Sequence, residues 1–196
     1  MSQQASAFGR SAFFRWTGRW TPGRLAECHW VGSWSSTALT PALADFWAAA
    51  LEAEVEDPSA LISLLLVAGH IGSAAVVEHR GRRIFRGYAA IRHPEDPFDE
   101  TSGIGRGRRL LFQEVPERKS GKNRLHIDVH SEPGGLDELV ARLEKLGATR
   151  IREVDEGLAG RWWVMQDPEG NEFCADIDIA SGEVTDHWAR STMHHL

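Results

Sequence analysis

Two short segments in the second half of the chain carry polar side chains at every second position. The first segment has His126, Asp128 and His130, and the second has Glu172, Cys174 and Asp176. Because side chains alternate along a strand, each set would project from one face. A histidine beside carboxylates can act as a general acid or base near neutral pH. We therefore predict His126 and Cys174 as candidate catalytic residues.

The same residues support two different roles. In one interpretation, His126 activates the Cys174 thiol as a nucleophile. In the other, His126 and Gln113 orient a polar ligand or satisfy each other, and Cys174 packs as a small hydrophobic side chain. Glu172 and Asp176 would then face solvent or a module interface.

Hydrophobic periodicity predicts the elements that would position these residues. Apolar residues recur at helical spacing over 42–51, after Thr40 and Pro41, a pair typical of a helix start. A second helix is predicted over 136–146, with Gly147 as its C-terminal cap. Strands are predicted over 28–35, 62–68, 74–79, 84–91, 110–115, 124–130, 150–154, 161–166 and 172–177.

The order of these elements indicates an internal duplication. Leu43 and Leu139 are 96 positions apart, and the helices align without a gap at this offset. Gln113 and Cys174 align at an offset of 61, so the first half holds 35 additional residues. The predicted fold class is α+β, with two βαβββ modules forming a curved mixed sheet around a cleft. The alternative is an unrelated α+β domain whose halves match by chance.

This pattern divides the chain into four parts. An N-terminal arm covers residues 1–27, and the first module covers 28–118 with an insertion near 80–107. The second module covers 119–180, and a C-terminal tail covers 181–196. The arm is rich in Arg and aromatic residues. It resembles a transit peptide in composition, but we favour an arm that docks on the protein itself or on a partner subunit. The insertion is expected to cover the cleft mouth or a dimer contact.

Composition limits the partners. The 196 residues carry a net charge of −6, which disfavours nucleic acid or an anionic membrane as a partner. The sequence has no apolar run of the roughly 18 residues that a membrane span needs. Two cysteines make no disulfide framework, and no secretory signal is evident, so a cytoplasmic location is expected.

Four segments together carry a resemblance to a known superfamily. They are Ala44–Leu51 (ADFWAAAL), Leu111–Lys119 (LFQEVPERK), Lys122–Asp128 (KNRLHID) and Asp167–Cys174 (DPEGNEFC). In this order and spacing, the chain resembles the vicinal-oxygen-chelate superfamily of glyoxalase, bleomycin-resistance and extradiol-dioxygenase relatives, in its glyoxalase-like actinobacterial branch. The resemblance covers residues 28–177 and implies paired modules that enclose a small molecule.

The resemblance also implies four positions for a divalent metal. These positions are Trp30, Gln113, His126 and Cys174, one on the first and one on the last strand of each module. Trp cannot ligate a metal and Gln is a weak neutral ligand, whereas a catalytic zinc needs about three protein ligands. His29 would point to the other face. We therefore expect no metal and no cofactor.

The combined prediction is a metal-independent, bleomycin-resistance-like small-molecule-binding protein that forms a homodimer. Its ligand would be an aromatic or oxygenated metabolite. The predicted ligand-binding residues are Trp30, Trp34, Gln113, Asp128, Trp163 and Glu172. One alternative is a lyase, isomerase or hydrolase that uses His126 as general acid or base, with or without a metal. Another is an interaction protein in which the insertion and the arm carry the function.

Overall fold

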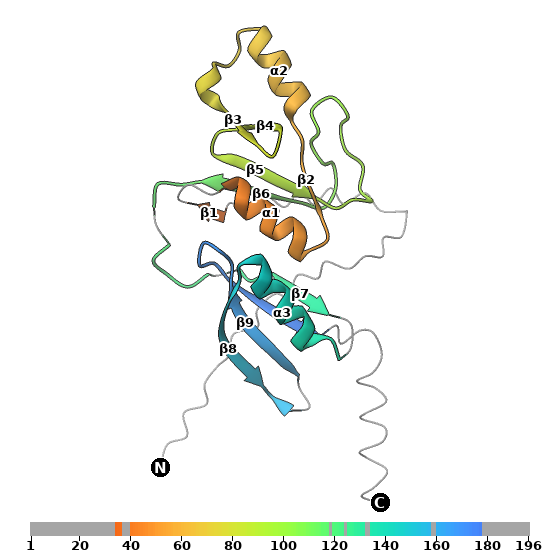
Figure 1. The fold of residues 1–196 in the computed structure, drawn as a ribbon, viewed down its shortest axis with the longest axis vertical. Coiled ribbons are helices and arrows are strands. Elements are labelled where there is room, and N and C mark those ends of the chain that lie inside the picture. Colours follow the sequence, from red (N-terminus) through yellow and green to blue (C-terminus); the bar gives the residue numbers. More distant parts are fainter. Residues whose placement is uncertain are drawn as a thin grey trace, which may run out of the picture.

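The computed structural model describes residues 34–36, 40–117, 119–123, 125–131, 134–157 and 160–177 (Figure 1). For residues 34–36 it describes the backbone. The predicted arm over 1–27, Trp30 and the predicted tail over 181–196 lie outside the described residues. None of the described helices is long and apolar enough to span a membrane.

The first half of the chain forms a four-stranded mixed sheet with one helix packed on it. Its strands are β1 (Trp34–Ser36), β2 (Glu54–Val55), β5 (Tyr88–Arg92) and β6 (Arg109–Glu114), in the order β1-β6-β5-β2. β1 and β6 are parallel, and the other neighbours are antiparallel. Helix α1 (Thr40–Ala50) contacts β5 and β6.

The second half follows the same strand order. β7 (Asp128–Ser131), β8 (Thr149–Asp155), β9 (Arg161–Gln166) and β10 (Glu172–Ile177) form a sheet in the order β7-β10-β9-β8. Helix α3 (Leu136–Leu146) contacts β7 and β10 and ends at Gly147, whose φ of 111° suits glycine. The α+β class is therefore confirmed, whereas the pairing of two modules around a cleft stays a prediction.

One hydrophobic core joins the two halves. In Figure 1, α1 and α3 lie at the boundary between them, and the two helices are in contact. Trp47 of α1 is fully buried and packs edge-on against Phe173 of β10, with ring centroids 5.2 Å apart. Its indole Nε1 donates a hydrogen bond of 3.1 Å to Asp167 in the turn before β10. The Phe46–Trp47 pair thus packs α1 of the first half against β10 of the second half.

The segment predicted as a strand over 62–68 is instead helix α2 (Ser59–Val67). The prediction was wrong because periodicity alone does not distinguish a short apolar strand from a short apolar helix. Local signals settle the outcome. Asp57 accepts a hydrogen bond from the Ser59 backbone, and Gly69, at a φ of 71°, ends the helix by donating to Leu66. Only Ile62 of this helix is buried, and Val67 is 90% exposed.

The additional elements of the first half are not one continuous insertion over 80–107. Strand β5 lies inside that range, yet it forms the interior of the first sheet between β6 and β2. The elements without a counterpart in the second half are α2, a 3-10 turn (η1, Ser73–Ala75), and the hairpin of β3 (Val76–His79) and β4 (Arg82–Phe85). The loop over 93–108 is the second addition.

Candidate functional site

The two sets of alternating polar residues meet on one face of the second sheet. β7 and β10 are parallel neighbours, with Asp128 beside Cys174 and His130 beside Asp176. His126 precedes β7, and its Nδ1 lies 3.6 Å from the Cys174 Sγ. A backbone hydrogen bond from Cys174 to Ile127 holds this register. We call the set of His126, Asp128, His130, Cys174 and Asp176 the β7–β10 face.

Burial controls the protonation of this face. It raises the pKa of Asp128 and of Asp176 above the ordinary value of 3.8. Burial, followed by the neighbouring Asp128 carboxylate, raises the pKa of the Cys174 thiol to about 12. The thiol is therefore protonated at neutral pH. A thiolate nucleophile at Cys174 is disfavoured, since the thiolate is the reactive form.

The protonated thiol links His126 to Asp128. Cys174 has one proton and two acceptors, the His126 Nδ1 and the Asp128 carboxylate. If the thiol donates to Nδ1, a neutral His126 carries its proton on Nε2 and offers a donor. If the thiol donates to Asp128, Nδ1 donates to sulfur and Nε2 becomes an acceptor. No described residue binds Nε2, so this atom can orient a ligand hydroxyl or carbonyl in either state.

Asp128→Asn should raise the free energy of unfolding at pH 7. Because burial raises the pKa of the folded carboxyl, the folded chain binds its proton more tightly than the unfolded chain. The stability this group contributes is present below its ordinary pKa of 3.8 and is lost as pH rises through the folded pKa. Asparagine has no charge to desolvate. The stability gain of the variant over the wild type should therefore grow from acid to neutral pH. Urea unfolding at several pH values measures this change.

Asp96→Asn is the control of opposite sign. A side-chain hydrogen bond from Arg108 lowers the pKa of Asp96, so this carboxylate contributes stability above pH 3.8 that is lost as the pH falls. The asparagine variant should therefore lose stability at pH 7 and approach the wild type in acid. If Asp128→Asn instead lowers the free energy of unfolding at pH 7, as expected for Asp96→Asn, then burial does not raise the pKa of Asp128.

The other predicted ligand-binding residues do not all reach the β7–β10 face. Glu172 lies on the same side of β10, but its carboxylate binds Lys119 Nζ at 2.9 Å and the Asn123 backbone at 3.0 Å. Trp163 pairs with Ala175 on the opposite side of the sheet, packs against the core, and lies under the Arg150 guanidinium at 5.0 Å.

The two predicted residues of the first sheet are placed by backbone register. Gln113 is half-buried on β6 beside Ser35 and Tyr88, and no hydrogen bond between described residues joins it to His126. Trp34 pairs with Phe112 in β1, and its side chain lies outside the described part of the structure. The β7–β10 face is therefore built from the second half of the chain.

The residues present do not fit a catalytic metal. Of the described positions implied by the resemblance, Gln113 offers a neutral amide and Cys174 a single half-buried thiol, leaving His126 as the one ordinary ligand. Among the described residues, no group of three His, Cys, Asp or Glu side chains is arranged to hold a metal ion.

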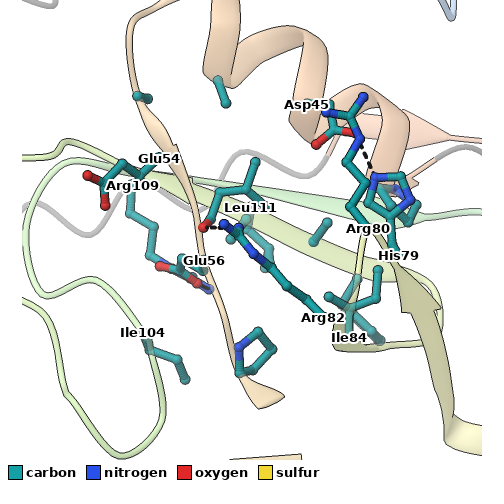
Figure 2. A pocket seen from close by; sticks show the side chains of 18 of the residues that line it. Asp45, Glu54, Glu56, His79, Arg80, Arg82, Ile84, Ile104, Arg109 and Leu111 are labelled. Atoms are coloured by element: carbon teal, nitrogen blue, oxygen red, sulfur yellow. Dashed lines mark hydrogen bonds and ion pairs between the residues drawn. The ribbon is translucent and has the colours of Figure 1, made fainter. Parts of the chain in front are cut away.

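A cavity that the sequence did not predict lies in the first half. Its volume is about 730 Å³, and its lining residues all fall between positions 41 and 111. They come from α1, β2, the β3–β4 hairpin, β5, β6 and the 93–108 loop (Figure 2). We call this cavity the hairpin pocket. No motif marked it, because its walls come from segments distant in sequence.

The fold and the polar sheet face define a small α+β protein with a candidate binding surface on its second sheet, and comparison with known proteins specifies its family. A model of the glyoxalase-like domain matches residues 35–175, which is most of the chain. The chain therefore belongs to the glyoxalase-like domain family. No curated protein matches the chain at a significant level.

Several solved structures are similar to this chain at low identity. A glyoxalase/dioxygenase from Nostoc punctiforme is 16% identical, with 83% of this chain and 97% of that chain covered and a TM-score of 0.47. A glyoxalase/bleomycin resistance protein/dioxygenase family enzyme from Burkholderia phytofirmans PsJN is 12% identical, with 75% and 95% covered and a TM-score of 0.46. Lactoylglutathione lyase from Agrobacterium tumefaciens is 12% identical, with 81% and 99% covered and a TM-score of 0.41. Similarity at this level carries no information about ligand or activity.

Proposed function

We propose that this protein is a metal-independent small-molecule-binding protein of the glyoxalase/bleomycin-resistance superfamily, in its actinobacterial glyoxalase-like branch. Its ligand is an aromatic or oxygenated metabolite held at the β7–β10 face. The proposal includes a cytoplasmic homodimer and two βαβββ modules around the binding cleft.

The observation that carries the proposal is the contact between His126 Nδ1 and Cys174 Sγ at 3.6 Å. The raised pKa of the thiol makes Cys174 a hydrogen-bonding partner of His126 rather than a nucleophile. Nε2 is then presented as a single donor or acceptor. A few convergent polar groups of this kind are typical of sites that orient small ligands.

His126→Gln should weaken ligand binding without unfolding the protein. Native mass spectrometry of the purified chain identifies any bound metabolite, and quenching of tryptophan fluorescence then measures its affinity. Loss of about one hydrogen bond corresponds to ~0.5–1.5 kcal/mol, or roughly a 2- to 13-fold weaker affinity. The free energy of unfolding should stay within about 1 kcal/mol, because His126 is half-buried.

The control is His70→Gln, which replaces an exposed histidine outside the β7–β10 face. It should change neither affinity nor stability. A large loss of stability in His126→Gln with unchanged affinity would contradict the proposal. So would stoichiometric zinc, iron or manganese in metal analysis that disappears in His126→Ala.

The second candidate function is a lyase, isomerase or hydrolase with His126 as general acid or base. The raised pKa of Asp128 favours it, since a carboxyl that stays protonated to higher pH can exchange protons with its neighbours. Turnover of the identified metabolite, with a rate that falls at least 100-fold in His126→Gln, would establish this function in place of simple binding.

A further inference from the structure

The hairpin pocket is held open by contacts that fix the β3–β4 hairpin to its surroundings. His79 Nε2 and Arg80 Nε lie 2.6 Å and 3.1 Å from the same Asp45 oxygen, which ties the hairpin to α1. On the other side, the Arg83 backbone donates to Ser59 Oγ at 2.9 Å and its guanidinium donates to Ser63 Oγ at 3.0 Å, which ties the hairpin to α2. The pocket is therefore largely preformed, as ligand sites usually are.

Small and apolar side chains shape its interior. They are Ala48, Ala49, Ala53, Val55, Ile84 and Leu111. Alanines leave room close to the backbone of α1. A cavity of about 730 Å³ is within the range for a drug-sized molecule. This interior suits a flat, mainly apolar ligand.

The carboxylates of the pocket wall are largely neutralised by cations. Asp45 binds His79 and Arg80, Glu54 binds Arg92, and Glu56 binds Arg109. An anionic ligand would therefore meet little repulsion from these three carboxylates. Glu52 also lines the pocket, but its side chain is exposed to water, which screens its charge.

Arg82 supplies the charge that a ligand would meet. Figure 2 shows Arg82 reaching from the hairpin toward β2, between the Asp45 cluster and the Glu56–Arg109 pair. It donates one hydrogen bond of 3.0 Å to the Val55 carbonyl. Its nearest carboxylate, Asp57, is 3.8 Å from Nε and half-exposed, which is too far for a direct hydrogen bond. A guanidinium has five donors, so Arg82 retains donors for an anionic group.

We propose that the hairpin pocket is a second small-molecule site, separate from the β7–β10 face. It binds a flat, mainly apolar molecule that carries one carboxylate or sulfonate, and Arg82 receives that anionic group. The hairpin and the loop at Ile104, which have no counterpart in the second half, form part of the walls of this site together with α1, β2, β5 and β6.

The test uses two fluorescent probes with the full chain. 8-Anilinonaphthalene-1-sulfonate carries a flat apolar ring system and one sulfonate, and N-phenyl-1-naphthylamine is its uncharged analogue. We expect both probes to bind with one site per chain by titration calorimetry, the sulfonate more tightly. Ala49→Phe places a ring in the pocket from an exposed helix position and should weaken both probes at least 10-fold.

Arg82→Gln tests the contribution of the Arg82 charge to probe binding separately from the fit of the probe in the pocket. It should weaken the sulfonate probe about 10-fold, as expected for one charge-assisted hydrogen bond, and leave the uncharged probe nearly unchanged. Arg161→Gln is the matched control, because Arg161 is a similarly exposed arginine in the second half that is already paired with Glu153 and Asp137. Thermal melts show that each variant is folded.

Three results would overturn the proposal. The first is unchanged affinity for both probes in Ala49→Phe. The second is loss of binding in His126→Gln, which would place the probe on the β7–β10 face. The third is loss of binding in Leu64→Ser, which would place it on the exposed apolar surface of α2, where Leu64 is 57% exposed.

Discussion

Glu56→Gln should lower the free energy of unfolding by about 3–5 kcal/mol, because it breaks a buried ion pair and leaves Arg109 without its partner. Glu56 is 6% exposed. Its Oε1 accepts hydrogen bonds of 2.7 Å from the Gly105 backbone and from Arg109 Nε, and its Oε2 accepts one of 2.9 Å from Arg109 Nη2. Glutamine keeps one acceptor but turns N–H donors toward the guanidinium.

Glu54→Gln is the matched control. Glu54 lies two residues earlier and also binds an arginine, Arg92, but it is 53% exposed. Water reaches the Glu54 carboxylate although the Arg92 side chain is only 11% exposed, so this variant should lose clearly less stability than Glu56→Gln in urea unfolding. Hydrogen exchange at the Gly105 amide should accelerate in Glu56→Gln alone. Equal losses of unfolding free energy in the two variants would show that burial does not increase the contribution of the Glu56–Arg109 ion pair to stability.

Trp47→Ala should lower the free energy of unfolding by about 3–5 kcal/mol, the usual effect of deleting a buried large aromatic side chain. Trp47 is fully buried and contacts Phe46 and Phe173, each with ring centroids 5.2 Å away. Trp47→Phe keeps an aromatic ring and removes the hydrogen bond from Nε1 to Asp167, and should lose about 1–3 kcal/mol. Urea unfolding measures both variants.

Phe98→Ala is the control for aromatic deletion at a surface. Phe98 is 43% exposed and stacks under the Arg92 guanidinium at 4.0 Å. Its loss should lower the free energy of unfolding by no more than about 1 kcal/mol. Should Trp47→Ala unfold as cooperatively and at the same urea concentration as the wild type, α1 would not join the two halves as the core contacts indicate.

The sequence predicted best those elements whose periodicity was strong. The helix over 136–146 and the last strand over 172–177 have the predicted bounds, because their apolar residues follow one face and Gly147 ends the helix. The first helix begins two residues early, at Thr40. The segment 62–68 is a helix and not the predicted strand, because a short, mainly apolar run fits either element and the boundary signals at Asp57 and Gly69 belong to a helix.

The assignment of side chains to faces was also predictable in part. Alternation along a strand placed His126, Asp128 and His130 together, and likewise Glu172, Cys174 and Asp176. Alternation places the adjacent Trp162 and Trp163 on opposite sides but does not say which of them shares a face with Cys174, and Trp163 is the predicted ligand-binding residue. The ladder decides this, because Trp163 pairs with Ala175 while Cys174 pairs with Val164.

The sequence by itself therefore determined the α+β class, the family resemblance, and the residue types available for chemistry, because these depend on composition and on local spacing. Tertiary structure alone decided which residues meet and in what protonation state. The parallel register of β7 and β10 sets Cys174 beside Asp128, and burial then raises the thiol pKa to about 12. The hairpin pocket is likewise tertiary, because its walls come from segments up to 70 positions apart, from Pro41 to Leu111. The local sequence pattern does not reveal contacts between segments that are distant in sequence, since these contacts form only when the chain is folded.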